Sequence, residues 1–197
     1  KVLSRKYRPQ KFNEIIGQPH VVDTLTNSIS SERLAHGYLF SGLRGVGKTT
    51  TARVLSKTLN CIDEVNDYPC EKCQNCIEIT GSRSLDVIEL DGASNRGIDE
   101  IREIKETVKY PPISSKYKIF IIDEVHMLTK EAFNALLKTL EEPPKNVIFI
   151  LATTDSHKIP DTILSRTLRF DFKRISNKAL SKHMSEILEK ENIKYEE

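Results

Sequence analysis

One run of residues constrains the fold of this chain more than any other, the segment Gly42-Leu43-Arg44-Gly45-Val46-Gly47-Lys48-Thr49. It fits the pattern G-x-x-x-x-G-K-[ST] between an apolar run and a helical pattern, which is the context that a phosphate-binding loop requires. Glycines let backbone N–H groups turn towards phosphates, and the start of the helix adds the positive end of its dipole. In such a loop Lys48 reaches the β- and γ-phosphates and the Thr49 hydroxyl ligates Mg²⁺. The alternative is a chance glycine-rich turn, which the flanking patterns disfavour. We therefore predict that residues 42–49 and Thr50 bind ATP.

Short apolar runs alternate with longer amphipathic stretches along the chain. Strands are predicted at 38–40, 87–90, 118–122, 147–152 and 168–172. The third and fourth are apolar on both faces, as in a sheet covered by helices. Helices are predicted at 48–59 and 130–142; the second follows Thr129 as N-cap and ends before Pro143-Pro144. This alternation predicts an α/β fold, an open sheet flanked by helices.

Two acids follow the predicted strand at 118–122. Asp123 would hold Mg²⁺, directly or through water, and Glu124 would polarise an attacking water. Adjacent acids after a strand are often only a solvated strand end, but the phosphate loop upstream favours the catalytic interpretation.

Two further positions fit the same chemistry less specifically. A hydroxyl of Thr153 or Thr154, after the strand at 147–152, could contact the γ-phosphate or the water, although threonine also simply favours strands. Arg166, ahead of the last strand, could stabilise charge on a phosphate. Alone, it would more often be a surface salt-bridge former.

All four cysteines of the chain lie within sixteen residues, at Cys61, Cys70, Cys73 and Cys76. Four soft ligands in one loop suit a closed tetrahedral Zn²⁺ site. A disulfide pair and an iron–sulfur cluster are the alternatives; the first is disfavoured in a reducing compartment and the second lacks its usual fourth cysteine and proline after Cys76. We predict a structural zinc insertion at about 61–80 that projects from the core.

Composition excludes little. Lys plus Arg (30) nearly balances Asp plus Glu (28), which neither demands nor excludes a nucleic-acid partner. The first eleven residues carry five basic residues and no acid, forming either a solvated arm or a contact surface. These are Lys1, Arg5, Lys6, Arg8 and Lys11. With no apolar stretch of about 20 residues and no signal-peptide pattern, we expect a soluble, cytoplasmic protein without a membrane partner.

Several longer motifs resemble one family over nearly the whole chain. They are Arg5-Lys6-Tyr7-Arg8-Pro9, Ile16-Gly17-Gln18, the phosphate loop, the cysteine spacing, 93–98, 122–128, 134–144 and Leu151-Ala152-Thr153-Thr154. Together they resemble the AAA+ ATPase region of bacterial DNA polymerase III γ/τ subunits, the motor of the sliding-clamp loader. The zinc insertion discriminates best, because most P-loop ATPases lack one.

The resemblance implies roles that spacing alone does not. Thr154 falls on the sensor-1 position, and Arg166 falls on an arginine that reaches the ATP site of the adjacent subunit. Thr167 replaces the cysteine that usually follows it, which leaves the charged group intact. Arg8 and Pro9 are expected to contact the nucleotide. His126 matches a family residue for which we expect only capping or packing.

The resemblance also implies an AAA+ fold with a five-stranded parallel sheet, a core over 1–174 and the start of a helical lid over 175–197. An arginine of the lid is expected beyond Glu197, so a longer chain should bind ATP more tightly.

The implied function is that of an ATP-hydrolysing motor that loads the sliding clamp onto primer–template DNA during replication. The implied partners are delta and delta-prime subunits and further copies of the chain in a pentameric ring. Arg96 and Lys130 are candidate contacts to DNA phosphates, insensitive to base sequence, with plain solvation as the alternative. The rival classes are a structural loader subunit without ATPase activity, a branch-migration helicase or replication initiator, and a small-molecule kinase. The intact phosphate loop and the two acids disfavour a structural subunit without ATPase activity. The cysteines and Arg166 disfavour a helicase or an initiator. The kinase lacks any sign of an acceptor site.

Overall fold

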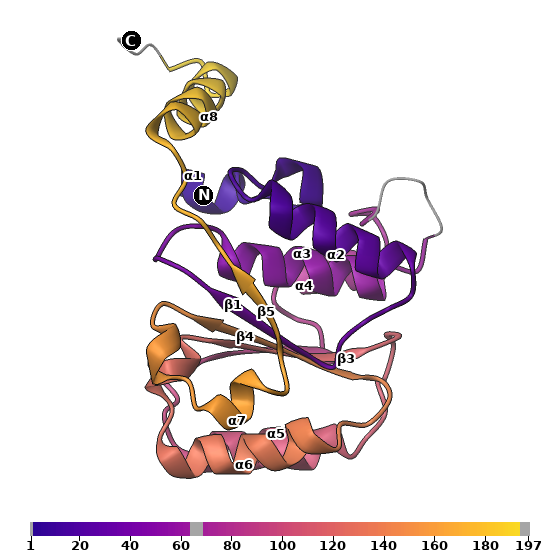
Figure 1. The fold of residues 1–197 in the computed structure, drawn as a ribbon. Helices are drawn as coiled ribbons and strands as arrows, with labels where there is room; N and C mark the ends of the chain where they lie inside the picture. Colours follow the sequence, from indigo (N-terminus) through magenta and orange to yellow (C-terminus); the bar gives the residue numbers. More distant parts are fainter. Residues whose placement is uncertain (1, 64–68, 194–197) are drawn as a thin grey trace.

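The computed structural model describes residues 2–63 and 69–193 (Figure 1). Lys1, residues 64–68 of the predicted zinc insertion and residues 194–197 of the predicted lid lie outside the described residues.

A five-stranded parallel sheet forms the centre of the molecule, with strand order β2-β3-β4-β1-β5. All five predicted strands are confirmed, each with bounds within one residue of those predicted. The strands are β1 (Gly37–Ser41), β2 (Val87–Asp91), β3 (Lys118–Asp123), β4 (Val147–Thr153) and β5 (Leu168–Asp171). β3 and β4 are buried along almost their whole length, as their continuous apolar sequence predicts.

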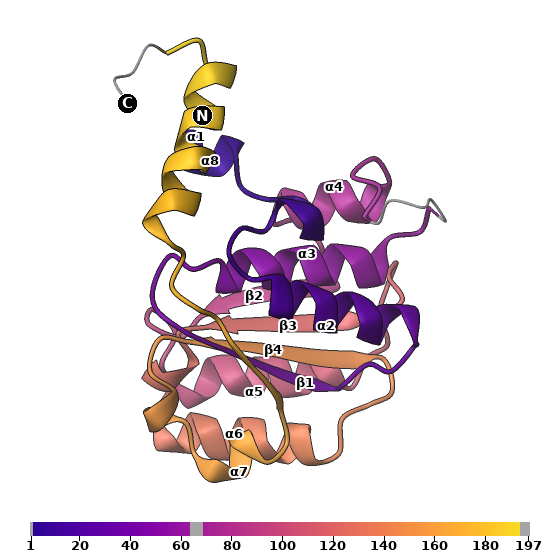
Figure 2. The ribbon, with the colours of Figure 1, turned by 45° about the horizontal axis from the view of Figure 1, so that its top comes forward.

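Helices cover both faces of the sheet: α2, α3 and α4 lie on one face, and α5, α6 and α7 on the other (Figures 1 and 2). The helices are α1 (Leu3–Lys6), α2 (Pro19–Ser30), α3 (Lys48–Asn60), α4 (Gln74–Thr80), α5 (Ile98–Val108), α6 (Lys130–Glu141), α7 (Asp161–Leu164) and α8 (Asn177–Lys190). The predicted cap of α6 is confirmed, because the Thr129 hydroxyl accepts a hydrogen bond from the backbone N–H of Ala132 at 3.2 Å. None of the helices in the described part of the chain has the length and apolar character that a membrane crossing needs.

Alternate residues of each central strand point to opposite faces of the sheet and belong to two separate hydrophobic clusters. In β1, Tyr38 and Phe40 pack with residues of α2 and α3, whereas Leu39 packs with α5 and α6. All three are at most 1 % exposed. Full burial of such a side chain contributes about 1.5–3 kcal/mol, so the two clusters hold the sheet rigidly between its helical layers.

Parallel strands give the sheet two chemically different edges. All five strands end at one edge, which we call the carboxyl edge, and begin at the other, the amino edge. The phosphate loop follows β1, the two acids close and follow β3, and Thr153-Thr154 close and follow β4, so these three segments meet at the carboxyl edge. Open α/β sheets bind ligands at this edge.

The helix α8 stands apart from the sheet beside the short helix α1 (Figures 1 and 2). The Tyr7 hydroxyl donates a hydrogen bond to Glu191 Oε1 at 2.5 Å, and Lys6 forms an ion pair with the same carboxylate. Ser176 caps α8 at the predicted start of the lid, and the helix itself buries no residue. The division into a core and a lid therefore remains a prediction.

Candidate active site

The phosphate loop connects β1 to α3 and depends on glycine at two positions. Gly47 has φ 100° immediately before α3, a left-handed conformation that L side chains rarely adopt. Gly42 has φ 149°, and a Cβ there would lie 2.6 Å from the carbonyl oxygen of Phe172. The first N–H groups of α3, which have no partner within the helix, thus begin directly at the loop.

Lys48 lies folded against this loop. Its ammonium donates hydrogen bonds of 2.8 Å to the carbonyl oxygens of Gly42 and Leu43, and the residue is 6 % exposed. Burial lowers the pKa of Lys48, while the nearby carboxylates of Glu124 and Asp123 raise it. The positive charge is thereby held between the loop and the two acids.

Thr49 and Asp123 come together from different elements. The Thr49 hydroxyl, in the first turn of α3, donates a hydrogen bond of 2.5 Å to Asp123 Oδ2 at the end of β3. The other carboxylate oxygen of Asp123 accepts the backbone N–H of Glu124 at 2.9 Å. Hydroxyl and carboxylate oxygens are ligands that Mg²⁺ prefers, so this pair could hold the metal.

Glu124 has an unusual backbone conformation and two side-chain neighbours. Its φ of 47° is left-handed, which is costly for a residue other than glycine and common at functional sites. The Thr154 hydroxyl donates to Glu124 Oε2 at 2.8 Å, and His126 Nδ1 lies 3.4 Å from the same oxygen. His126 Nδ1 also lies 3.0 Å from Thr153 Oγ1. His126, for which we expect only capping or packing, thus lies against the carboxylate of Glu124 and the hydroxyl of Thr153.

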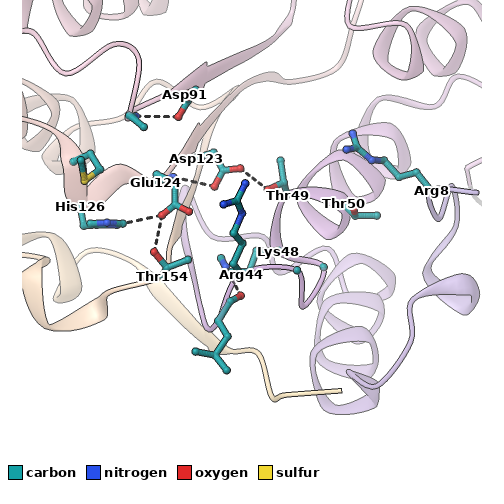
Figure 3. Close-up of a pocket in the computed structure, with 15 residues that line it drawn as sticks. Arg8, Arg44, Lys48, Thr49, Thr50, Asp91, Asp123, Glu124, His126 and Thr154 are labelled. Carbon is teal, nitrogen blue, oxygen red and sulfur yellow. Dashed lines mark hydrogen bonds and ion pairs between the residues drawn. The ribbon is translucent and has the colours of Figure 1, made fainter. Parts of the chain in front are cut away.

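These side chains surround a cavity of about 840 Å³ (Figure 3). Its lining includes eleven predicted site residues, namely Arg8, Leu43, Arg44, Gly45, Gly47, Lys48, Thr49, Thr50, Asp123, Glu124 and Thr154. Pro9, Gly42 and Val46 are not part of the lining. The buried Val46 instead directs its carbonyl oxygen to Gln18 Nε2, at 3.3 Å.

Sequence reasoning missed three further lining residues, Asp91, Ala93 and Met127. Asp91 ends β2, and the hydrogen bond from the Ser94 hydroxyl is the largest of the contacts that lower its pKa. The sequence position of Asp91, a carboxylate at the end of a predicted strand, could have indicated that it lies near the site.

Arg166 lies away from this cavity. It follows α7 at the amino edge, where Nη2 pairs with Glu141 Oε1 at 2.9 Å and Nη1 donates to the Thr162 carbonyl oxygen at 2.8 Å. Its backbone adjoins Gly37, the first residue of β1, whereas the phosphate loop follows the last. Five strand residues at about 3.3 Å each separate the two by roughly 16 Å.

The two candidate DNA contacts lie near each other. Arg96 and Lys130 are both exposed, and the carbonyl oxygen of Arg96 accepts the N–H of Thr129, which precedes Lys130. Their contact with DNA remains a prediction.

The four cysteines converge at the far end of α3 from the phosphate loop. Cys61 follows the last residue of α3, Cys73 caps α4, and Cys76 lies within it. Their four sulfur atoms all lie within 4.8 Å of one another. All four are free thiols, with 4.0 Å between the sulfurs of Cys70 and Cys76, so no disulfide joins them.

The donor set of this cluster fits a metal ion. The N–H groups of Lys72 and Cys73 point to Cys70 Sγ at 3.4 and 3.2 Å. Burial raises the pKa of Cys73, but hydrogen bonds from the backbone of Ile62 and Cys76 lower it to about 7. Tetrahedral thiolates at about 2.3 Å from one ion would be about 3.8 Å apart, close to the spacing seen.

Comparison with known proteins adds the family. A sequence profile described as the delta subunit of DNA polymerase III matches residues 17–176, a range that contains the phosphate loop, both acids and all four cysteines. The chain belongs to this family.

Two bacterial relatives match the chain almost end to end. DNA polymerase III subunit tau of Bacillus subtilis is 52 % identical over 195 residues, covering 99 % of the chain and 35 % of the relative. DNA polymerase III subunit gamma of Buchnera aphidicola from Acyrthosiphon pisum is 51 % identical over 196 residues, covering 100 % and 54 %. The resemblance to γ/τ subunits is confirmed, and the chain spans about a third to a half of these relatives.

The fold recurs in a more distant protein. The RuvB Holliday junction branch migration motor of Thermotoga maritima superposes with a TM-score of 0.66 at 19 % identity, covering 96 % of the chain and 56 % of that protein. At this identity the likeness concerns the fold alone, a parallel sheet covered by helices on both faces, and it does not favour a helicase.

Proposed function

We propose that the chain is the ATP-hydrolysing motor region of a bacterial clamp-loader subunit, which opens a sliding clamp and loads it onto primer–template DNA. The observation that carries this proposal is the meeting of Thr49, Asp123, Glu124 and Thr154 at one cavity, within a family of DNA polymerase III subunits. ATP would lie with its phosphates on the loop 42–50.

The residues of the cavity would have different roles in ATP hydrolysis. Lys48 would neutralise phosphate charge, and Thr49 and Asp123 would hold Mg²⁺, which when bound would stabilise charge on the transferring phosphate. Glu124 orients and polarises the attacking water, and Thr154 and His126 hold its carboxylate in place. Arg8 and Arg44 line the same cavity, where they would bind the nucleotide.

Arg166 would act on a different copy of the site. It lies at the amino edge, partly exposed with its guanidinium on Glu141, and is absent from the lining of its own cavity. In a head-to-tail ring the amino edge of one subunit can face the carboxyl edge of the next. We therefore assign Arg166 to the ATP site of the adjacent subunit, in a pentamer that also contains delta and delta-prime subunits.

The cysteine cluster would hold one structural Zn²⁺. Four protein thiolates complete a tetrahedral shell, so the ion has no open position for chemistry. Metal analysis of the purified protein should find one zinc per chain, and Cys73→Ser should lose it and lower Tm. Retention of full zinc content by that variant, or iron in place of zinc, would contradict the assignment.

A single assay tests the proposed function. ATPase activity of the full-length protein in its assembled loader should rise when the clamp and primed DNA are added together. Lys48→Ala should abolish nucleotide binding and activity. Activity that ignores both clamp and DNA would argue for a different motor.

A further inference from the structure

The N-terminal arm forms a second cavity with α3 and the end of α4. It measures about 470 Å³ and adjoins the nucleotide cavity, with which it shares Arg8. It is lined by Arg5, Arg8, Gln10, Arg53 and Lys57, together with Thr80 and Ser82. A cavity of this size suits a small ligand. Its lining includes Arg5, a residue of the basic arm that does not line the nucleotide cavity.

The lining carries four positive charges and little to balance them. Arg53 pairs with Glu89 through two contacts, of 2.7 and 2.9 Å. The side chains of Arg5 and Arg8 form no hydrogen bond or ion pair with any residue in 2–63 or 69–193. Burial lowers the pKa of Arg8, and the charges of Arg53 and then Arg5 lower it further, while Glu89 opposes them. The guanidinium groups are thus close enough to repel one another.

Lys57 adds a charge that is almost fully buried. The residue is 2 % exposed, and its ammonium donates one hydrogen bond, of 2.6 Å, to the neutral amide oxygen of Gln10. An ammonium has three donors, and a buried charge is costly unless it is paired. Burial is also the main cause that lowers the pKa of Lys57, against Glu71 and Cys76, which raise it.

We propose that this cavity binds a small phosphate anion through Lys57, Arg5 and Arg8. A doubly charged tetrahedral oxyanion would accept hydrogen bonds from several cationic donors at once and balance the excess charge. A singly charged carboxylate would leave most of that excess in place. Ser82 lines the same cavity and its hydroxyl offers a further donor, whereas the Thr80 hydroxyl donates to Gln10 Oε1 at 3.3 Å.

Titration calorimetry with inorganic phosphate tests this site. The full-length protein is first saturated with a non-hydrolysable ATP analogue and Mg²⁺, so that the phosphate loop is occupied up to the γ-phosphate position and only a second site remains to be filled. Wild type should bind about one phosphate per chain. Lys57→Met should raise the Kd tenfold or more, and Arg5→Gln about threefold, because Arg5 is exposed and contributes only part of the charge. Lys105→Met, an exposed lysine of α5 on the opposite face of the sheet, should leave the Kd unchanged.

Two outcomes would overturn the proposal. One is the absence of a second binding event in wild type, or an equal Kd for phosphate in wild type, Lys57→Met and Arg5→Gln. Because Arg5 is exposed, Arg5→Gln should fold, and its comparison with wild type stays valid even if Lys57→Met fails to fold. The other is displacement of bound inorganic phosphate by an oligonucleotide whose total phosphate concentration is far below that of the inorganic phosphate. That result would make the cavity part of a nucleic-acid surface. Failure of the ATP analogue to bind in the first step would instead count against the proposed ATPase function.

Discussion

The two edges of the sheet use polar residues in opposite ways. At the amino edge, buried polar groups are bound to backbone: the Asp86 carboxylate accepts the N–H groups of Ile113, Ser114 and Ser115 at 2.8–2.9 Å. Lys118 likewise donates to the carbonyl oxygens of Thr107 and Tyr110. At the carboxyl edge, Thr49, Asp123, Glu124 and Thr154 bind one another around a cavity.

The polar side chains at the amino edge therefore serve stability, whereas those at the carboxyl edge are available for ligand binding and chemistry. A side chain that satisfies buried backbone groups cannot be released without leaving them unpaired, which costs about 1–3 kcal/mol. Side chains that bind one another can exchange those partners for a ligand. Arg166 is the exception at the amino edge, because it is partly exposed and bound to another side chain, Glu141.

The largest effect is expected at Glu124. Glu124→Gln keeps an oxygen to accept the Thr154 hydrogen bond but removes the charge that polarises water, so kcat should fall about 10³-fold. ATP affinity, measured by titration calorimetry, should change less than about threefold, since the loop is untouched. A parallel loss of affinity would mean that Glu124 binds nucleotide rather than water.

Asp86 should show the reverse pattern. Asp86→Asn places an amide among backbone donors, so the free energy of unfolding should fall by about 1–3 kcal/mol while kcat per folded molecule is unchanged. Denaturant titration measures the first and active-site-normalised ATPase activity the second. A loss of kcat without a loss of stability would erase the distinction between the edges.

The same carboxylate predicts a dependence on pH. Burial raises the pKa of Asp86, but the hydrogen bonds from Ile113, Ser114 and Ser115 outweigh burial and lower it. A lowered folded-state pKa stabilises the protein above the unfolded value near 3.9, and that stability is lost as pH falls through the folded value. The difference in stability between wild type and Asp86→Asn should therefore shrink on acidification below about pH 4; a constant difference would contradict it.

Thr154 should give the smallest of these effects. Thr154→Val removes the hydroxyl that holds Glu124 while keeping the shape, so kcat should fall about tenfold with little change in Tm. Thr154→Ser, which restores the hydroxyl, should recover most of the rate. Equal rates in the valine and serine variants would show that the Thr154 hydroxyl has no role in catalysis.

Local pattern sufficed to predict the strands and the loop. β3 and β4 are buried on both faces, which leaves continuous apolar runs in the sequence, and the loop needs its glycines at fixed spacing. The acids after β3 and the hydroxyl after β4 were predictable because parallel strands end at one edge.

Contacts between distant segments could not be predicted in the same way. His126 has no local signature, and its role depends on Thr153 of the neighbouring strand β4. The cavity at Lys57 depends on the arm lying across α3, which no periodicity encodes. The position of Arg166 at the amino edge likewise depends on β5 pairing with β1, at the far side of the sheet from β2.

Mixing two inactive variants of the full-length protein tests the central claim, that the site is completed by a neighbouring subunit. Glu124→Gln lacks the water-polarising group, and Arg166→Ala lacks the arginine; each alone should be nearly inactive. In rings assembled at random from equal amounts of both, roughly a quarter of the sites between two copies of the chain would combine an intact Glu124 with an intact neighbouring Arg166. We predict recovery of ATPase activity to about that fraction of wild type, and a mixture no more active than its separate components would contradict completion of the site by a neighbour.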